Sequence, residues 1–119
     1  MSVEKFQLQE IELPDGITLV FSDFSTYDHS TQYSLELSSK YLSEDLFQAS
    51  FDEGRLVIDL GWYGDIETNI GEYKIQIIYG SDWDYPVTTI FAKSQGEARD
   101  TLIRVLAHVA SGDMFEDEE

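Results

Sequence analysis

Two short segments of the sequence place an aromatic pair directly beside carboxylates. One is Gly61-Trp62-Tyr63-Gly64-Asp65 and the other is Ser81-Asp82-Trp83-Asp84-Tyr85. Tryptophan and tyrosine supply large, rigid contact surfaces at low cost in conformational entropy, and carboxylates accept hydrogen bonds from a partner's lysine or arginine. This combination predicts a protein-binding surface. Its predicted members are Tyr63, Asp65, Asp82, Trp83, Asp84 and Tyr85.

A third group, Asp23, Tyr27 and Asp28, combines the same residue types earlier in the chain, and we expect it to extend this surface. The two tryptophans also allow a second interpretation, in which their rings close a core while the neighbouring acids face water. Trp62 is in phase with the alternating apolar residues of 56–60, so both interpretations of its ring stay open.

Catalytic patterns are sparse. The chain has two histidines and no Gly-x-Ser-x-Gly motif, so Asp28 beside His29 is the pair that keeps a small hydrolase open as an alternative. His108 falls in the last turn of a predicted helix, where its imidazole suits the helix dipole. Neither a calcium loop nor a glycine-rich phosphate loop is present. We therefore predict a protein that is not an enzyme, with no catalytic residues, metal ligands or cofactors.

The net charge points to the class of partner. With 24 acidic and 7 basic residues among 119, the formal charge is −17. Nucleic acids and anionic lipids are bound through lysine and arginine, so we expect no nucleic-acid or membrane partner, and a basic protein instead. The absence of cysteine, of a signal-peptide pattern and of any apolar run of about 20 residues predicts a cytoplasmic protein.

The elements that position these residues follow from periodicity. Turn signals at Pro14-Asp15-Gly16 and Asp52-Glu53-Gly54 predict two hairpins. Apolar residues alternate along several runs, which predicts strands with one core face and one wet face. The alternating runs begin at Tyr33, Phe47, Leu56 and Tyr73, further strands are predicted at 6–13, 17–21 and 86–91, and residues 25–32 read as an irregular loop.

Near the end of the chain the period becomes helical. Ser94 and Glu97 have the spacing of a capping box, apolar residues recur at helical intervals from Ala98 to Val109, and Gly112 stops the helix. The predicted fold is α+β: a mostly antiparallel sheet of about six or seven strands with one C-terminal amphipathic helix packed on one face. We expect a single domain over residues 1–112 and a solvated acidic tail over 113–119.

The segment Tyr73-Lys74-Ile75-Gln76-Ile77-Ile78-Tyr79-Gly80-Ser81-Asp82-Trp83-Asp84-Tyr85-Pro86, followed by the helix, resembles the immunity proteins of bacterial toxin-immunity systems, such as contact-dependent growth inhibition. The resemblance covers roughly the last 50 residues. It implies binding to a cognate toxin, often a basic nuclease, whose active site or approach to nucleic acid is then blocked. The sequence diversity of these proteins permits no residue-by-residue transfer.

Two functions therefore stand side by side. The first is an acidic inhibitor that neutralises a basic toxin through carboxylates and aromatics. The alternative is a phage or plasmid anti-defence protein that mimics DNA, which predicts carboxylates spaced like phosphates along an elongated face. The oligomeric state stays open.

Overall fold

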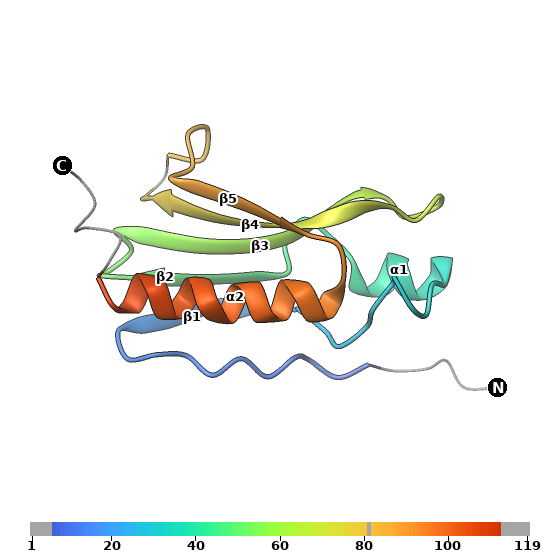
Figure 1. Ribbon diagram of the computed structural model, residues 1–119, viewed down its shortest axis with the longest axis horizontal. Helices are drawn as coiled ribbons and strands as arrows, with labels where there is room; N and C mark the ends of the chain where they lie inside the picture. The colour runs from blue at the N-terminus through green and yellow to red at the C-terminus, as the bar shows by residue number, and fades with distance from the viewer. Residues whose placement is uncertain (1–5, 81, 113–119) are drawn as a thin grey trace.

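The computed structural model describes residues 6–80 and 82–112 of the chain. They form one five-stranded antiparallel sheet and two helices, an α+β fold as predicted (Figure 1). The strands pair with their neighbours in chain order. The elements are β1 (Ile17–Ser22), α1 (Leu35–Tyr41), β2 (Phe47–Phe51), β3 (Leu56–Asp65), β4 (Ile70–Tyr79), β5 (Thr88–Ala92) and α2 (Gln95–Ala110).

The hairpins of the central sheet follow the turn signals. Residues Asp52, Glu53 and Gly54 all have positive φ, and the amide of Arg55 donates to the carbonyl of Asp52 (3.1 Å), which joins β2 to β3. The strand predicted at 86–91 does pair with β4, beginning at Thr88. Pro86 precedes the strand because it has no N–H to donate to the ladder.

The predicted strand count was too high. Among the described residues, the segment before β1 forms a single bridge, Leu8 to Ser25, and no strand. The amide of Gln9 donates to the carbonyl of Phe24 (2.7 Å), so this segment pairs with the chain after β1 instead of with β1. The turn at Pro14 therefore closes no hairpin, and the prediction there was wrong.

The run beginning at Tyr33 was also wrongly predicted as a strand, because it contains helix α1. Ser34 caps the helix by accepting a hydrogen bond from the amide of Leu37 (3.3 Å), with Glu36 in the first turn and Lys40 in the last. These capping and charge preferences outweigh a three-residue apolar alternation. Leu37 is buried, whereas Leu35 is half exposed.

Helix α2 confirms the prediction for the end of the chain. The Ser94 hydroxyl accepts from the amide of Glu97 (3.2 Å), and the Glu97 carboxylate accepts from the amide of Lys93 (2.6 Å). Past the helix, Gly112 takes a positive φ of 83°, and its amide donates to the carbonyl of Val109. The predicted tail, 113–119, lies outside the described residues. Within the described residues, neither helix has the length and apolar character needed to cross a bilayer.

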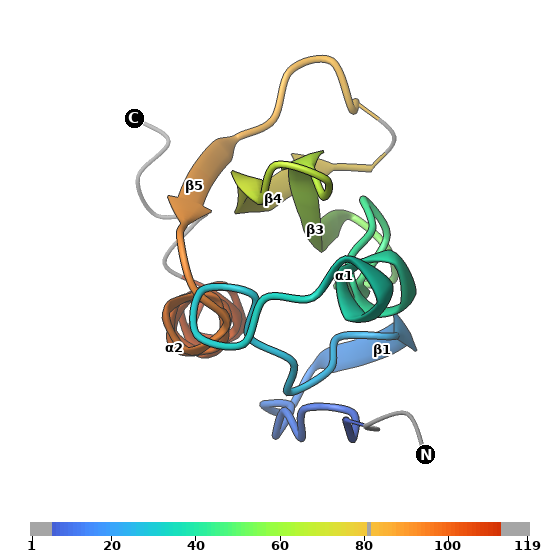
Figure 2. The ribbon, with the colours of Figure 1, turned by 90° about the vertical axis from the view of Figure 1, so that its right-hand side faces the viewer.

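The sheet curls around one core, and α2 packs against β4 and β5 on the concave side (Figure 2). We call this side the inner face and the opposite side the outer face. The inner face is apolar and buried. It carries Phe47, Ala49, Leu56, Ile58, Leu60, Trp62, Tyr73, Ile75, Ile77 and Ala92.

Candidate functional site

The outer face presents a polar row across four strands. The register aligns Gln48 of β2, Asp59 of β3, Gln76 of β4 and Thr89 of β5. Each of these residues alternates with core residues on its own strand, so its side chain leaves the sheet on the side away from α2. The predicted alternation of apolar and polar residues is confirmed, but the outer side is not wet throughout, because Asp59 is 5% exposed and Ile78 is fully buried.

A loop adds two acids to this face beside Tyr63. The amide of Trp62 donates to the carbonyl of Ser43 (2.7 Å), and the amide of Leu46 donates to the carbonyl of Leu60 (3.0 Å). The chain between Ser43 and Leu46 bulges over Gly61, where a Cβ would overlap the carbonyl of Glu44. Glycine is therefore required at Gly61 for this close approach.

We call Glu44, Asp45, Asp59 and Tyr63 the acidic patch. Burial raises the pKa of Asp59 above its ordinary value of 3.8, and the charge of Asp45 adds to the effect, while a long hydrogen bond from Gln48 (3.5 Å) opposes it. Burial is also the largest cause that raises the pKa of Tyr63. The negative charges of Asp59, Glu44 and Asp45 raise this pKa further, in decreasing order of effect. The four groups thus share one negative field.

Lys74 limits this field, since its charge lowers the pKa of Asp59. Lys74 Nζ lies 4.1 Å from the centre of the Tyr63 ring, a cation–π contact on the outer face. Lys93 pairs with Glu72 (3.1 Å) at the neighbouring strands. A cation therefore contacts the Tyr63 ring, while the charges of Asp59, Glu44 and Asp45 act on its hydroxyl, an arrangement that suits a rigid aromatic anchor.

The β4–β5 loop carries the second predicted segment. The amide of Asp82 donates to the carbonyl of Tyr79 (2.9 Å), and the amide of Tyr85 donates to the carbonyl of Asp82 (3.3 Å). This turn exposes 46% of Trp83 and 78% of Tyr85. The loop rises from the sheet on the side away from α2 (Figure 2). It therefore borders the outer face.

The structure does not bring the two predicted segments into contact. Asp65 pairs with Ile70 at one end of β4, whereas Asp82 follows Tyr79 at the other end. Nine residues of extended chain separate these ends by about 30 Å. The predicted surface is thus two clusters on one face, the acidic patch beside Asp65 and the aromatic loop of Asp82, Trp83, Asp84 and Tyr85.

One predicted surface residue, Tyr27, and the tryptophan with two open interpretations, Trp62, are both buried in the core. Tyr27 is 1% exposed, and its hydroxyl lies 2.7 Å from that of Ser38, so the prediction of Tyr27 at a binding surface was wrong. Its ring meets Phe6 edge-on, with 5.4 Å between centroids, because the core takes up the aromatic rings of this loop. Trp62 is 3% exposed, which decides between its two interpretations in favour of the core.

The two acids of the early group differ in their relation to the patch. Asp28 holds its own loop, since its Oδ1 accepts from the amide (3.0 Å) and the hydroxyl (2.6 Å) of Ser30. Asp23 is exposed, and its amide donates to the carbonyl of Leu46 (2.7 Å) at the end of the loop that carries Glu44 and Asp45. It lines a hollow of about 360 Å³ together with Ser43, Leu46 and Lys40. Asp23 therefore borders the acidic patch, whereas Asp28 is used within its own loop.

The Asp28 and His29 pair does not form the arrangement that a hydrolase requires. Trp62 Nε1 donates to His29 Nε2 (3.2 Å), so His29 Nδ1 carries the proton and donates to Asn69 Oδ1 (3.0 Å). Both ring nitrogens of this buried histidine are engaged, and neither bonds to Asp28. Within residues 6–80 and 82–112, no three histidine, aspartate or glutamate side chains cluster closely enough to hold a metal.

Sequence reasoning missed Glu44, Asp45 and Asp59 as site residues. Gly61 inside a predicted strand was the available signal, because glycine there marks a close backbone approach. Comparison with known proteins gave no match to a family model, a curated protein or a solved structure. The function of this chain is therefore inferred from its own geometry.

Proposed function

We propose that this protein is an acidic inhibitor that binds and neutralises a basic protein. Its proposed action is that of an immunity protein on a toxin nuclease. The observation that carries the proposal is the outer face, which α2 leaves uncovered and which holds an aromatic anchor among carboxylates. Carboxylates at such a surface steer a basic partner into contact and reject acidic ones.

The outer face has the dimensions of a binding surface. Ten residues of β3 extend about 33 Å, and five strands span about 19 Å. Because β1, β2 and β5 have six, five and five residues, the sheet alone covers less than this rectangle, and a partner that buries roughly 800 Å² must also contact the loops at its edges. Exposed Phe91 and Trp83 add apolar contact area at the β5 side of the same face. One partner can therefore touch the acidic patch and the aromatic loop together.

The DNA-mimic alternative has less support. A mimic needs regularly spaced carboxylates along an elongated face, but the central row of the outer face holds uncharged Gln48, Gln76 and Thr89 beside Asp59. Carboxylates gathered around Tyr63 favour recognition of a folded basic protein instead. Clustered carboxylates therefore favour the inhibitor of a basic protein over the DNA mimic.

The test uses a basic partner that is first isolated by pull-down with this protein and identified by mass spectrometry. Asp82→Asn with Asp84→Asn, and separately Glu44→Gln with Asp45→Asn, should each slow association about tenfold at low salt without lowering the melting temperature. Raising the salt to 0.5 M should remove most of the difference. Glu10→Gln with Glu12→Gln is the control, because it changes the net charge equally at exposed residues before β1. Equal slowing by all three pairs would contradict a localised site.

A further inference from the structure

A groove between α2 and β5 differs in character from the rest of this acidic protein. Its volume is about 400 Å³, within the range of small-molecule sites. Its lining holds no carboxylate. The lining residues are Ile77, Thr88, Ile90, Thr101, Arg104, Val105 and His108.

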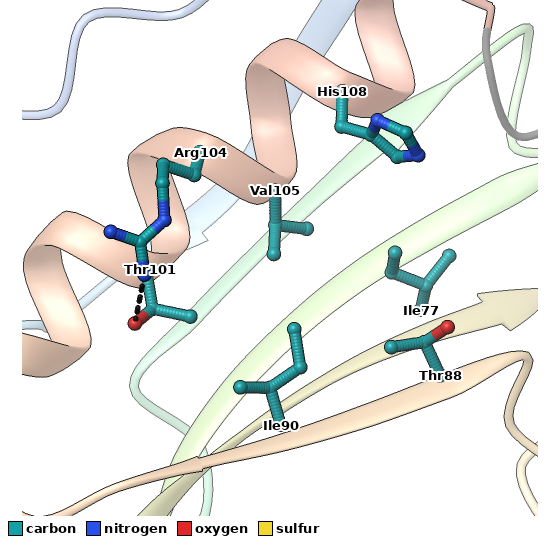
Figure 3. Close-up of a pocket in the computed structure, with 7 residues that line it drawn as sticks. All are labelled: Ile77, Thr88, Ile90, Thr101, Arg104, Val105 and His108. Atoms are coloured by element: carbon teal, nitrogen blue, oxygen red, sulfur yellow. Dashed lines mark hydrogen bonds between the residues drawn. The ribbon is translucent and has the colours of Figure 1, made fainter.

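The groove has an apolar floor and a cationic rim. Ile77, Ile90 and Val105 form the floor, and Arg104 lies at the α2 side, with its guanidinium turned toward Thr101 (Figure 3). Arg104 Nη2 donates to Thr101 Oγ1 (3.3 Å). Among the described residues, no carboxylate lies within 4 Å of the Arg104 guanidinium.

This arrangement suits an anion with an apolar body. A guanidinium presents five donors, and the hydrogen bond to Thr101 uses one, so a carboxylate can still bind in bidentate fashion. Other arginines are already committed to acids: Arg99 pairs with Asp100 (2.9 Å) and Arg55 with Asp52 (3.5 Å). Arg104 is exposed at the rim of the hydrophobic groove instead, where its guanidinium bonds to Thr101.

We propose that the α2–β5 groove binds a small aliphatic monocarboxylate, with its carboxylate on Arg104 and Thr101 and its chain over Ile90, Val105 and Ile77. This site is separate from the outer face, since Thr88 and Ile90 point to the opposite side of β5 from Thr89. Its occupation by a ligand therefore does not depend on the proposed protein partner.

Octanoate is the probe, titrated into methyl-labelled protein and followed by NMR. We expect saturable shifts at the methyl groups of Ile77, Ile90 and Val105, with a Kd on the order of 1 mM because the ligand is small and the groove is open. Octanol, which has the same chain without the charge, should bind about tenfold more weakly. Shifts that do not saturate, or equal affinity for octanol, would overturn the proposal.

Matched variants test the role of the guanidinium. Arg104→Gln should weaken octanoate binding about fivefold to tenfold, while Arg99→Gln, which changes the net charge equally on the same helix, should leave it unchanged. Arg104→Lys should bind with intermediate affinity because it keeps the charge and loses the bidentate geometry. If Arg104→Gln and Arg99→Gln weaken binding equally, general electrostatics explain the effect and the assigned site is wrong.

Discussion

The two segments that join tryptophan, tyrosine and aspartate have nearly the same composition and opposite structural roles. Residues 61–65 lie in β3, where alternation sends Trp62 into the core at 3% exposure and Tyr63 to the outer face. Residues 82–85 lie in a loop, which exposes Trp83 and Tyr85 together. A strand separates adjacent side chains onto two faces, whereas a loop imposes no such alternation. Equal composition therefore gives one anchor in the strand and two in the loop.

The glycines beside the two segments should show the largest difference. Gly61→Ala should destabilise the protein by about 3 kcal/mol or more, because its Cβ would overlap the Glu44 carbonyl, a backbone atom that cannot move aside cheaply. Gly80→Ala faces open space and should cost only about 1 kcal/mol for its positive φ of 55°. Urea unfolding measures the loss in free energy of unfolding for each variant. Equal losses would show that the loop at 43–46 can shift to accommodate the added Cβ at little cost.

The tryptophans give the second contrast. Trp62→Phe should cost about 2 kcal/mol, because it removes the N–H that His29 Nε2 accepts and leaves that buried acceptor unpaired. Trp83→Phe should change stability by less than about 0.5 kcal/mol, since its ring is half exposed. Each variant leaves one tryptophan as a fluorescent probe. Acrylamide should quench Trp83 readily and Trp62 poorly, and the reverse order would contradict the two roles.

The buried carboxylate of the patch should respond to pH. Because the pKa of Asp59 is raised, the folded protein holds this proton more tightly than the unfolded chain, so ionisation lowers stability as pH rises through the folded pKa. Asp59→Asn should therefore stabilise the protein at pH 7 by about 1 kcal/mol, roughly 4 °C in Tm. The gain should vanish below the ordinary pKa of 3.8.

Asp84→Asn is the control for this prediction, because Asp84 is exposed and its substitution should leave Tm nearly unchanged at both pH values. A gain from Asp59→Asn that persists in acid would show that its origin is packing, and would remove the electrostatic explanation.

The smallest expected effect is on Tyr63. Burial and then the Asp59 charge raise its pKa, so Asp59→Asn should lower it toward its ordinary value of 10.0 without reaching it. Asp84→Asn should leave the Tyr63 titration unchanged, because the β4–β5 loop lies at the far end of β4. NMR titration of labelled tyrosine measures both, and an equal response to the two variants would show that the patch and the loop share one field.

The predictable part of this fold is the part that local sequence controls. Helix α2, its Ser94 cap and the alternating faces of β2 to β4 were read correctly because each depends on residues close in the chain. The run at Tyr33 failed because three alternating residues fit a strand and a capped helix equally well. Too many strands were predicted because the alternating segment before β1 forms only one bridge. Whether a segment pairs as a strand depends on residues far away in the chain.

The candidate site divides in the same way. The aromatic loop was predicted from four adjacent residues, Asp82 to Tyr85, and their exposure depends on one local turn. Glu44 and Asp45 were not predicted, because they reach Tyr63 only through the contact of their loop with Gly61. Tyr27 was misplaced since the sequence does not reveal which aromatic rings of an irregular loop turn inward.

By itself, the sequence determined the sign and size of the charge, the alternation of each long strand and the end of the chain as a capped helix. These follow from composition and from contacts within a few residues. Only the tertiary structure decided which face stays uncovered, which carboxylates become neighbours and which tryptophan is buried. Those outcomes depend on a close backbone contact at Gly61 and on the packing of α2 against one side of a curled sheet. Both contacts join residues far apart in the chain, and such contacts leave no periodicity or motif in the sequence.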